Sequence, residues 1–305
     1  MKRTERSIIG PVRRWYRRHG RSLPWRGETD PYRIIVSEIM LQQTQVARVL
    51  EKYPLFLRRF PSMRSLARAP LREVILEWRG MGYNNRAVRL HALAAVLARR
   101  NMIVPRSEEA LLELPGIGKY TAHAILSSVH GLPVPLVDVN IRRLFSRVFW
   151  NMRSTSEMRS EREIWEAAGR VLPRRSVYGW NQALMDLGAT ICTARRPACE
   201  RCPLAELCAS RSGMERVRTA PGRGVKKREP GFRGVPNRIY RGRIVEALRR
   251  NRKGLAAGAL GGEISEDFSR RDLPWLARIL EGLERDGLVR ISRPGARASA
   301  RVRLA

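Results

Sequence analysis

One stretch constrains the fold of this chain more than any other: LLELPGIGKYTAHAILSSVHGLPVPLVDVNIRR, residues 111–143. Residues 111–114 read as the end of a short helix, and residues 119–129 carry apolar side chains at helical spacing. Between them lies a tight turn containing Gly116 and Gly118, because glycine tolerates a positive φ and a close backbone approach. The stretch therefore predicts two helices joined by a glycine turn. The free N–H groups that begin the second helix suit an anion such as a phosphate.

A nucleotide-binding P-loop also places a Gly-Lys pair in a glycine-rich turn, so the two motifs must be told apart. The P-loop needs a further glycine five residues before the pair and a Ser or Thr directly after the lysine. Here the pair is Gly118-Lys119, and Glu113 and Tyr120 occupy those two positions. The P-loop class is therefore excluded.

Four cysteines gather near the end of the helical region. They are spaced C-x6-C-x2-C-x5-C: Cys192, Cys199, Cys202 and Cys208. Four thiols this close together suit either tetrahedral zinc or an iron–sulfur cluster. Zinc sites more often pair two CxxC knuckles and this chain has one, but the residues alone leave the metal open. Arg195, Arg196 and Arg201 in the intervening loops predict a basic surface around the site.

Charge narrows the choice of partner. The 305 residues include 60 Lys+Arg against 28 Asp+Glu, a formal net charge of +32. An arginine-rich proteome is one explanation, and a polyanion such as nucleic acid is the favoured one. No apolar run approaches the roughly 18 residues of a membrane span, and the N-terminus leads into no secretory segment. We expect a monomer without a membrane partner, located in the cytoplasm and associated with the nucleoid.

Composition divides the chain into three segments. Residues 1–210 show helical spacing and no convincing alternating strand, which predicts an all-α domain, including one helix over 32–50. Residues 211–237 are rich in Gly, Pro, Arg and Lys, which predicts a basic flexible linker. Residues 238–305 resemble a small winged-helix-like α+β domain.

The winged-helix-like segment has a predicted order of elements. Helices are expected at 239–250, 265–270 and 274–286, with strands near 288–292 and 301–304. Such a domain binds DNA, binds a protein or only stabilises the fold. The charge of the chain favours DNA, with Arg270, Arg271 and Arg278 as candidate contacts.

Beyond the glycine turn and the cysteines, longer motifs follow one another in an order that resembles the adenine DNA glycosylases of the MutY family. The matching stretches are LPWR at 23–26, SEIMLQQTQV at 37–46, GMGYNNRAVRLH at 80–91, LPGIGKYTA at 114–122, VDVN at 137–140 and WNQALMDLGATIC at 180–192. The resemblance covers about residues 8–210. It implies a two-lobed, all-α helix-hairpin-helix glycosylase domain that acts on double-stranded DNA with a mismatched or damaged base pair. The cysteine spacing matches the [4Fe–4S] loop of this family and of endonuclease III.

The resemblance also implies catalytic roles that the chemistry supports. Glu38 matches the acid that protonates the flipped adenine at N7, and burial among apolar neighbours would keep it protonated. Asp138 matches the carboxylate that stabilises the oxocarbenium-like sugar. Asn140 is expected to orient Asp138 or the attacking water.

Further positions match DNA contacts of the family. Arg26 and Gln182 match residues that contact the extruded base. The amides of Gln42 and Gln43 suit base edges or a vacated stack, and Tyr83 matches a wedge in the duplex. The remaining candidate contacts, at the hairpin phosphates, are Gly116, Gly118 and Lys119.

Position 120 decides the type of reaction. Relatives that also cut the strand carry a lysine here, whose amine forms a Schiff base with the sugar. This chain has Tyr120, and Lys119 is rotated roughly 100° around the helix. We therefore expect a monofunctional glycosylase with at most weak strand cleavage.

Two departures from the family pattern leave alternatives. Residues 211–305 do not resemble the Nudix-like domain that checks for 8-oxoguanine on the opposite strand. The segment VDVN replaces the more usual DGN, and this pattern also resembles glycosylases that remove thymine or uracil opposite guanine. The favoured substrate is adenine opposite 8-oxoguanine or guanine. The alternatives are a G:T or G:U glycosylase and a non-catalytic iron–sulfur DNA-binding regulator.

Overall fold

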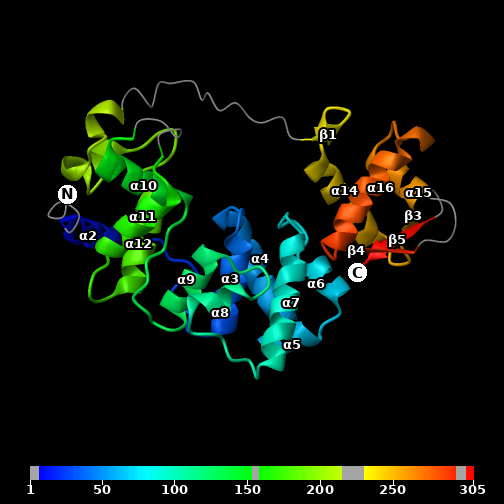
Figure 1. The fold of residues 1–305 in the computed structure, drawn as a ribbon, viewed down its shortest axis with the longest axis horizontal. Helices are drawn as coiled ribbons and strands as arrows, with labels where there is room; N and C mark the ends of the chain where they lie inside the picture. The colour runs from blue at the N-terminus through cyan, green and yellow to red at the C-terminus, as the bar shows by residue number, and fades with distance from the viewer. Residues whose placement is uncertain (1–6, 153–157, 215–229, 293–299) are drawn as a thin grey trace. The chain divides into compact units, whose positions relative to one another are not determined.

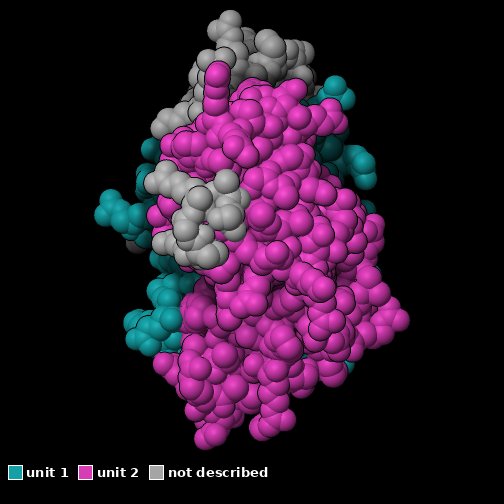
Figure 2. Space-filling view, turned by 90° about the vertical axis from the view of Figure 1, so that its right-hand side faces the viewer, with its two compact units in different colours: residues 1–35, 105–113, 117–224 teal, residues 36–104, 114–116, 225–305 magenta. Residues whose placement is uncertain are grey.

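The computed structural model describes residues 7–152, 158–214, 230–292 and 300–305. The chain forms two compact units, coloured separately in Figure 2. Unit 1 comprises residues 1–35, 105–113 and 117–224, and unit 2 comprises residues 36–104, 114–116 and 225–305. Among the described residues, no helix is both long and apolar enough to cross a membrane.

Unit 1 is helical throughout its described residues. Its helices are α2 (Ile9–His19), α8 (Glu108–Leu112), α9 (Lys119–Ser128), α10 (Val139–Trp150), α11 (Glu161–Arg170) and α12 (Val177–Thr190) (Figure 1). The core of this unit lies between α2, α9, α10, α11 and α12, where Phe145 and Trp180 are fully buried. Short 3-10 turns at 199–201, 205–207 and 211–213 follow α12 and carry the cysteine loop.

The first part of unit 2 is also helical. Helix α3 (Pro31–Leu41) crosses the boundary at residue 35, and α4 (Val46–Arg59), α5 (Met63–Arg68), α6 (Leu71–Glu77) and α7 (Asn85–Arg99) follow. The prediction of one helix over 32–50 is wrong. Gln43 adopts a left-handed backbone with φ 57°, which interrupts the helix between Leu41 and Val46. Leu50, at the end of the predicted helix, is 40% exposed.

The C-terminal part of unit 2 mixes helices and strands. Its elements are β1 (Gly231–Phe232), β2 (Val235–Pro236), α14 (Asn237–Arg250), β3 (Leu255–Ala256), α15 (Ala257–Ile264), α16 (Leu273–Arg285), β4 (Val289–Ser292) and β5 (Arg301–Leu304). Strands β3, β5 and β4 form an antiparallel sheet in that order. The hairpin β1–β2 packs Phe232 on Trp275, with ring centroids 4.0 Å apart.

Two features of this region differ from the sequence-based prediction. The second helix lies at Ala257–Ile264 and not at 265–270. The ring of Phe268 packs so close to Gly261 that no side chain fits at position 261. Glycine is a poor helix former, which hid this helix in the sequence. Within the predicted linker, residues 231–237 contain β1, the turn at 233–234, β2 and the first residue of α14, and residues 215–229 lie outside the described residues.

Candidate active site and iron–sulfur loop

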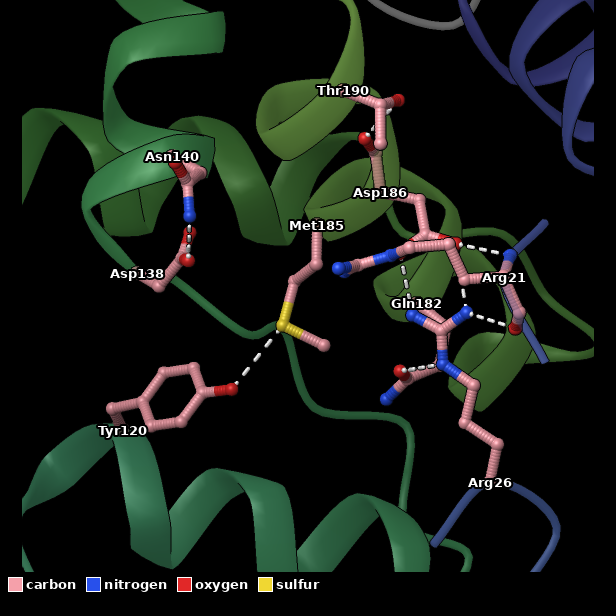
Figure 3. Close-up of polar contacts among 9 residues, drawn as sticks. All are labelled: Arg21, Arg26, Tyr120, Asp138, Asn140, Gln182, Met185, Asp186 and Thr190. Carbon is pink, nitrogen blue, oxygen red and sulfur yellow. Dashed lines mark hydrogen bonds and ion pairs between the residues drawn. The ribbon is translucent and has the colours of Figure 1, made fainter. Parts of the chain in front are cut away.

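The carboxylate of Asp138 is fixed at the start of α10. Asp138 is the N-cap of this helix, and its Oδ1 accepts a hydrogen bond from the Ile141 backbone N–H at 2.7 Å. Its Oδ2 accepts a hydrogen bond from Asn140 Nδ2, also at 2.7 Å (Figure 3). Both oxygens are therefore held by residues of their own helix turn, and the half-buried side chain has a set direction.

Helices α10 and α12 approach each other closely at Asn140. A Cβ atom at Gly188 would lie 2.9 Å from Asn140 Cβ, so only glycine fits at that point of α12. Arg143, which is 6% exposed, donates hydrogen bonds to Asn140 Oδ1 at 2.9 Å and to the Gly188 carbonyl at 2.6 Å. Its Nε also donates to the Cys192 carbonyl at 2.8 Å. Arg143 therefore links the Asn140 side chain to the beginning of the cysteine loop.

A second group of polar side chains surrounds Asp186 of α12. Asp186 is completely buried, and its two oxygens accept a bidentate pair of bonds from Arg26, at 2.6 and 2.7 Å. Arg21 adds its Nε at 2.7 Å and its backbone N–H at 2.9 Å. Arg26 Nε donates to Gln182 Oε1 at 3.0 Å (Figure 3). The structure thus brings the two predicted base contacts, Arg26 and Gln182, directly together.

Burial alone would raise the pKa of Asp186, but the hydrogen bonds from Arg26 and Arg21 outweigh it and hold this pKa below its usual value. The same ion pair raises the pKa of Arg26 against the opposing effect of its burial. Asp186 therefore remains a carboxylate in the folded protein.

The lowered pKa of Asp186 predicts a dependence of stability on pH. A carboxylate whose pKa is lower in the folded than in the unfolded state contributes stability above its unfolded value, here near 3.8. That contribution is lost as the pH falls below 3.8 toward the folded value. The unfolding free energy of the wild type should therefore fall more steeply below about pH 4 than that of Asp186→Asn. Urea unfolding at a series of pH values measures this, and parallel curves would contradict it.

Tyr120 and Lys119 point to different partners at the start of α9. The Tyr120 hydroxyl donates to Met185 Sδ of α12 at 3.2 Å. The Lys119 Nζ lies 4.5 Å from the centroid of the Trp165 ring, a cation–π contact with α11. The predicted rotation between the two side chains agrees with these contacts.

The two glycines of the hairpin turn have different structural needs. Gly116 has φ 80°, and a Cβ there would lie 3.0 Å from Arg89 Cβ, so its backbone and its surroundings both require glycine. Gly118 is the N-cap of α9 with φ −105°, which any residue adopts, and a Cβ there would meet no described protein atom within 4 Å. Gln42 Nε2 donates to the Gly116 carbonyl at 3.3 Å. The fold therefore requires glycine at position 116 and does not require it at position 118.

The loop before α7 presents Tyr83 to solvent. Tyr83 is 55% exposed and has a left-handed backbone with φ 43°, which is unfavourable for an aromatic residue. Arg86, which is 5% exposed, holds this loop: it donates to the carbonyls of Met81 and Gly82 at 2.9 and 3.1 Å. It also donates to the carbonyls of Ile39 and Met40 at 2.9 Å each.

Arg86 therefore ties the Tyr83 loop to the end of α3, the helix that carries Glu38. Burial lowers the pKa of Arg86 to about 10, so the side chain remains charged at neutral pH. Glu38 is half-buried between the buried Ser37 and Ile39, and its Oε2 is shielded from solvent. Gln43, one turn further, is exposed. Unit 2 thus carries Glu38, Gln42, Gln43 and Tyr83, and unit 1 carries the other predicted catalytic and base-contact residues.

The four cysteines line one pocket with about 370 Å³ of empty space, including its opening. No group of three or more Cys, His, Asp or Glu in the described parts of the chain is arranged to hold a single metal ion. Four thiols that line one pocket would suit the iron–sulfur cluster that the cysteine spacing implies. Burial raises the pKa of Cys202 to about 12 and raises that of Cys208. Metal coordination would favour the thiolate forms that burial disfavours.

Arg147 supports the same pocket. It is 2% exposed, and its Nη1 donates to the Thr193 carbonyl at 2.7 Å and lies 3.4 Å from Cys192 Sγ. Its Nη2 donates to the Ala194 carbonyl at 2.9 Å. A buried guanidinium beside the thiols favours their ionised form.

Comparisons with known proteins agree with this geometry. Residues 36–170 match the model of the HhH-GPD superfamily of base excision DNA repair proteins, and residues 192–208 match the iron–sulfur binding domain of endonuclease III. Adenine DNA glycosylases of Mycobacterium tuberculosis and Mycolicibacterium smegmatis are each 36% identical to this chain. The first alignment covers 93% of both chains, and the second 96% of both. The chain belongs to the adenine DNA glycosylase family.

As a member of that family it is a DNA N-glycosylase, and the predicted family and the predicted [4Fe–4S] cofactor are confirmed. The human adenine DNA glycosylase is 38% identical over 68% of this chain and 40% of its own length. A thermostable thymine-DNA glycosylase is 30% identical with a TM-score of 0.63, over 69% of this chain and 97% of that one. An endonuclease III–DNA complex has a TM-score of 0.62 at 22% identity, over 71% and 99%, and shows the shared helical fold.

Several residues around the site were not singled out from the sequence. They are Arg21, Arg86, Arg143, Arg147, Met185, Asp186 and Gly188. Asp186 had a detectable signal, because it lies four residues after Gln182 on the same helix face within an apolar run. The arginines had none, since the chain has many exposed arginines that look the same in sequence.

Proposed function

We propose that this glycosylase removes adenine paired with 8-oxoguanine or guanine, and that it does so without cutting the strand. The observation that carries the proposal is the carboxylate of Asp138, held through both oxygens at the start of α10 in a member of the adenine DNA glycosylase family. A fixed negative charge stabilises the cationic sugar that forms as the base leaves. Relatives named for adenine align over 93% and 96% of the chain.

We propose the following roles for the other residues of the site. Glu38 protonates the leaving adenine at N7, and Asn140 orients Asp138. Gln182 Oε1 already accepts a hydrogen bond from Arg26 Nε. The Gln182 NH2 group is therefore the part of this side chain that donates to the base. Gln42, Gln43 and Tyr83 fill and wedge the duplex. Cys192, Cys199, Cys202 and Cys208 would hold the iron–sulfur cluster, which would fix their loop when bound.

The C-terminal elements support a winged-helix assignment. Their order is helix, strand, two helices and two strands, and the last strand lies centrally in an antiparallel sheet. We propose a domain organisation of a glycosylase domain over residues 1–210, a basic linker and this winged-helix-like domain. The net charge of +32 supports DNA as the partner, with a monomer acting on the nucleoid in the cytoplasm.

Base release from four duplexes tests the proposed substrate. The duplexes contain adenine opposite 8-oxoguanine, adenine opposite guanine, thymine opposite guanine and uracil opposite guanine, and hot alkali cleaves each abasic product. We expect release of adenine from the first two. The likeness to a thymine-DNA glycosylase at 30% identity makes pyrimidine release the second candidate. Release of thymine or uracil alone would establish that candidate instead.

Tyr120 predicts that no covalent intermediate forms with the enzyme. Its phenol cannot form a Schiff base with the sugar, and Lys119 contacts the Trp165 ring. Borohydride added during turnover should therefore trap no enzyme–DNA adduct, and strands should break only after alkali. An adduct that disappears in Lys119→Ala would contradict this prediction.

The two hairpin glycines predict opposite effects. Gly116→Ala should destabilise the fold by about 1–2 kcal/mol, because an L-residue is forced into the left-handed region. Gly118→Ala should leave stability unchanged and weaken DNA binding, because the added methyl group lies where a phosphate approaches the N–H groups of α9. Thermal unfolding and fluorescence anisotropy measure the two effects. Wild-type DNA affinity in Gly118→Ala would exclude this phosphate contact.

A further inference from the structure

The C-terminal domain, residues 230–305, is hydrogen-bonded to the loop that carries Tyr83. Arg249 of α14 has a side chain that is 7% exposed, and its Nη2 donates to Asn84 Oδ1 at 3.0 Å and to the Ile75 carbonyl at 2.8 Å. Asn84 directly follows Tyr83 and caps α7. Glu246, 3.0 Å from Arg249, neutralises the guanidinium. A buried arginine of the C-terminal domain therefore holds the residue next to the exposed aromatic.

Apolar packing adds to this hydrogen-bonded contact. Ile75 of α6 is completely buried in the core of the C-terminal domain, together with Ile244 and Leu248 of α14. Glu246 also forms an ion pair with Arg79, at the start of the Tyr83 loop. The C-terminal domain is thus packed onto the helices that carry this loop.

The outer face of the sheet in this domain is basic. Alternation along β4 and β5 turns Val289, Val302 and Leu304 into the core and leaves the residues between them exposed. Six exposed cations lie on this face and in the turn that follows Arg249, and we name them the arginine face: Arg250, Arg252, Lys253, Arg290, Arg301 and Arg303.

Charge on the arginine face has no carboxylate partner among the described residues. Arg290 and Arg303 are directly opposite each other in the β4–β5 ladder, an arrangement that repels. Within the described residues, no carboxylate forms a salt bridge with any of the six cations. Two other arginines of the domain are neutralised: Arg233 pairs with Asp272, and Arg241 pairs with Asp286. A like-charge pair at neighbouring strand positions is relieved when an anion binds across it.

We propose that the arginine face binds the phosphate backbone of the duplex that flanks the Tyr83 loop. This inference rests on the proposed function for its choice of DNA as the polyanion. Arg249 is hydrogen-bonded to Asn84 of the loop, and the arginine face and Tyr83 belong to the same compact unit. The contact lies on the sheet and its adjoining turn, and not at Arg270, Arg271 and Arg278, the positions expected from the sequence.

A pair of matched double variants tests the location. Arg290→Ala with Arg303→Ala removes two charges from the arginine face, and Arg278→Ala with Arg285→Ala removes two exposed charges from α16. Binding of an undamaged duplex is measured by fluorescence anisotropy between about 50 and 200 mM salt. The first variant should lower the slope of log K against log salt by about 2, because each lost phosphate contact removes about 0.9. The α16 variant should keep the wild-type slope.

Equal losses in both variants would indicate only an effect of net charge and would overturn the proposal. A loss confined to the α16 variant would place the contact on that helix. Binding of an undamaged duplex requires no base release, so it separates this inference from the proposed function. If the wild type releases no base, and the two double variants still differ in slope as predicted, the proposed substrate is refuted. The proposal that the arginine face binds phosphates then stands.

A charge reversal adds a readout that a structural role would not produce. Arg303→Glu replaces the repulsive pair by an attractive one with Arg290, so the unfolding temperature of the unbound protein should rise. The same variant should bind the duplex more weakly than the wild type. A lower unfolding temperature, or unchanged DNA affinity, would contradict the assignment of this face to an anion.

Discussion

Replacing Asp138 by asparagine is expected to reduce the rate of base release by about 10³-fold without loss of the fold. The asparagine oxygen can still accept the hydrogen bond from the Ile141 N–H, and Asn caps helices as well as Asp does. What is lost is the negative charge that stabilises the cationic sugar, together with the second oxygen that accepts the hydrogen bond from Asn140 Nδ2. Single-turnover release of adenine at saturating enzyme measures the effect.

Asp30→Asn is the matched control for this variant. Asp30 Oδ1 accepts a hydrogen bond from the Tyr32 N–H at 2.8 Å at the start of α3, so the substitution makes the same chemical change at another helix start. The control should keep the wild-type rate, and both variants should keep the wild-type unfolding temperature. Near-normal release by Asp138→Asn would remove Asp138 from the mechanism.

Truncating Asp186 to alanine is expected to destabilise the protein by about 3 kcal/mol. The buried carboxylate accepts four hydrogen bonds from Arg21 and Arg26, and its removal leaves the largely buried Arg26 guanidinium uncompensated. Base release should fall as well, because Arg26 then no longer fixes the Gln182 oxygen. Urea unfolding gives the free energy, and single-turnover release gives the rate.

Asp286→Ala provides the comparison for an exposed pair. Asp286 pairs with Arg241, and the two side chains are 38% and 31% exposed. Solvent screens such a pair, so this variant should lose less than about 1 kcal/mol and keep the wild-type rate. If both substitutions cost the same, the Asp186 ion pair is not a determinant of stability.

Much of this architecture could be predicted from the sequence because it depends on local patterns. The helices around the glycine turn, α10 and α12 follow apolar spacing, and the spacing of the cysteines indicated their shared site. The break between α3 and α4 was missed because it depends on the backbone of Gln43 and not on a glycine or proline. Helix α15 was missed because it contains several glycines, which are poor helix formers. Gly261 packs against the ring of Phe268, a contact that cannot be seen in the sequence.

Partners of the catalytic residues could not be predicted in the same way. Asn140 and Asp138 lie two positions apart, so their contact is local, whereas Arg143 and Gly188 reach Asn140 from a different turn and a different helix. Such contacts depend on how helices cross. The role of Gly188 is visible only once the distance between α10 and α12 is known.

Helix α12 (Val177–Thr190) and the residues directly after it fix three contacts of the site. Gln182 and Asp186 contact Arg26, Gly188 admits Asn140, and the chain then enters the metal loop at Cys192. Inserting or deleting one residue in this helix would rotate everything beyond it by roughly 100°. The arginine contacts would then lose register with the asparagine contact and with the first thiolate. Descendants of this sequence can therefore vary α12 by substitution, whereas a change in its length separates the three contacts at once.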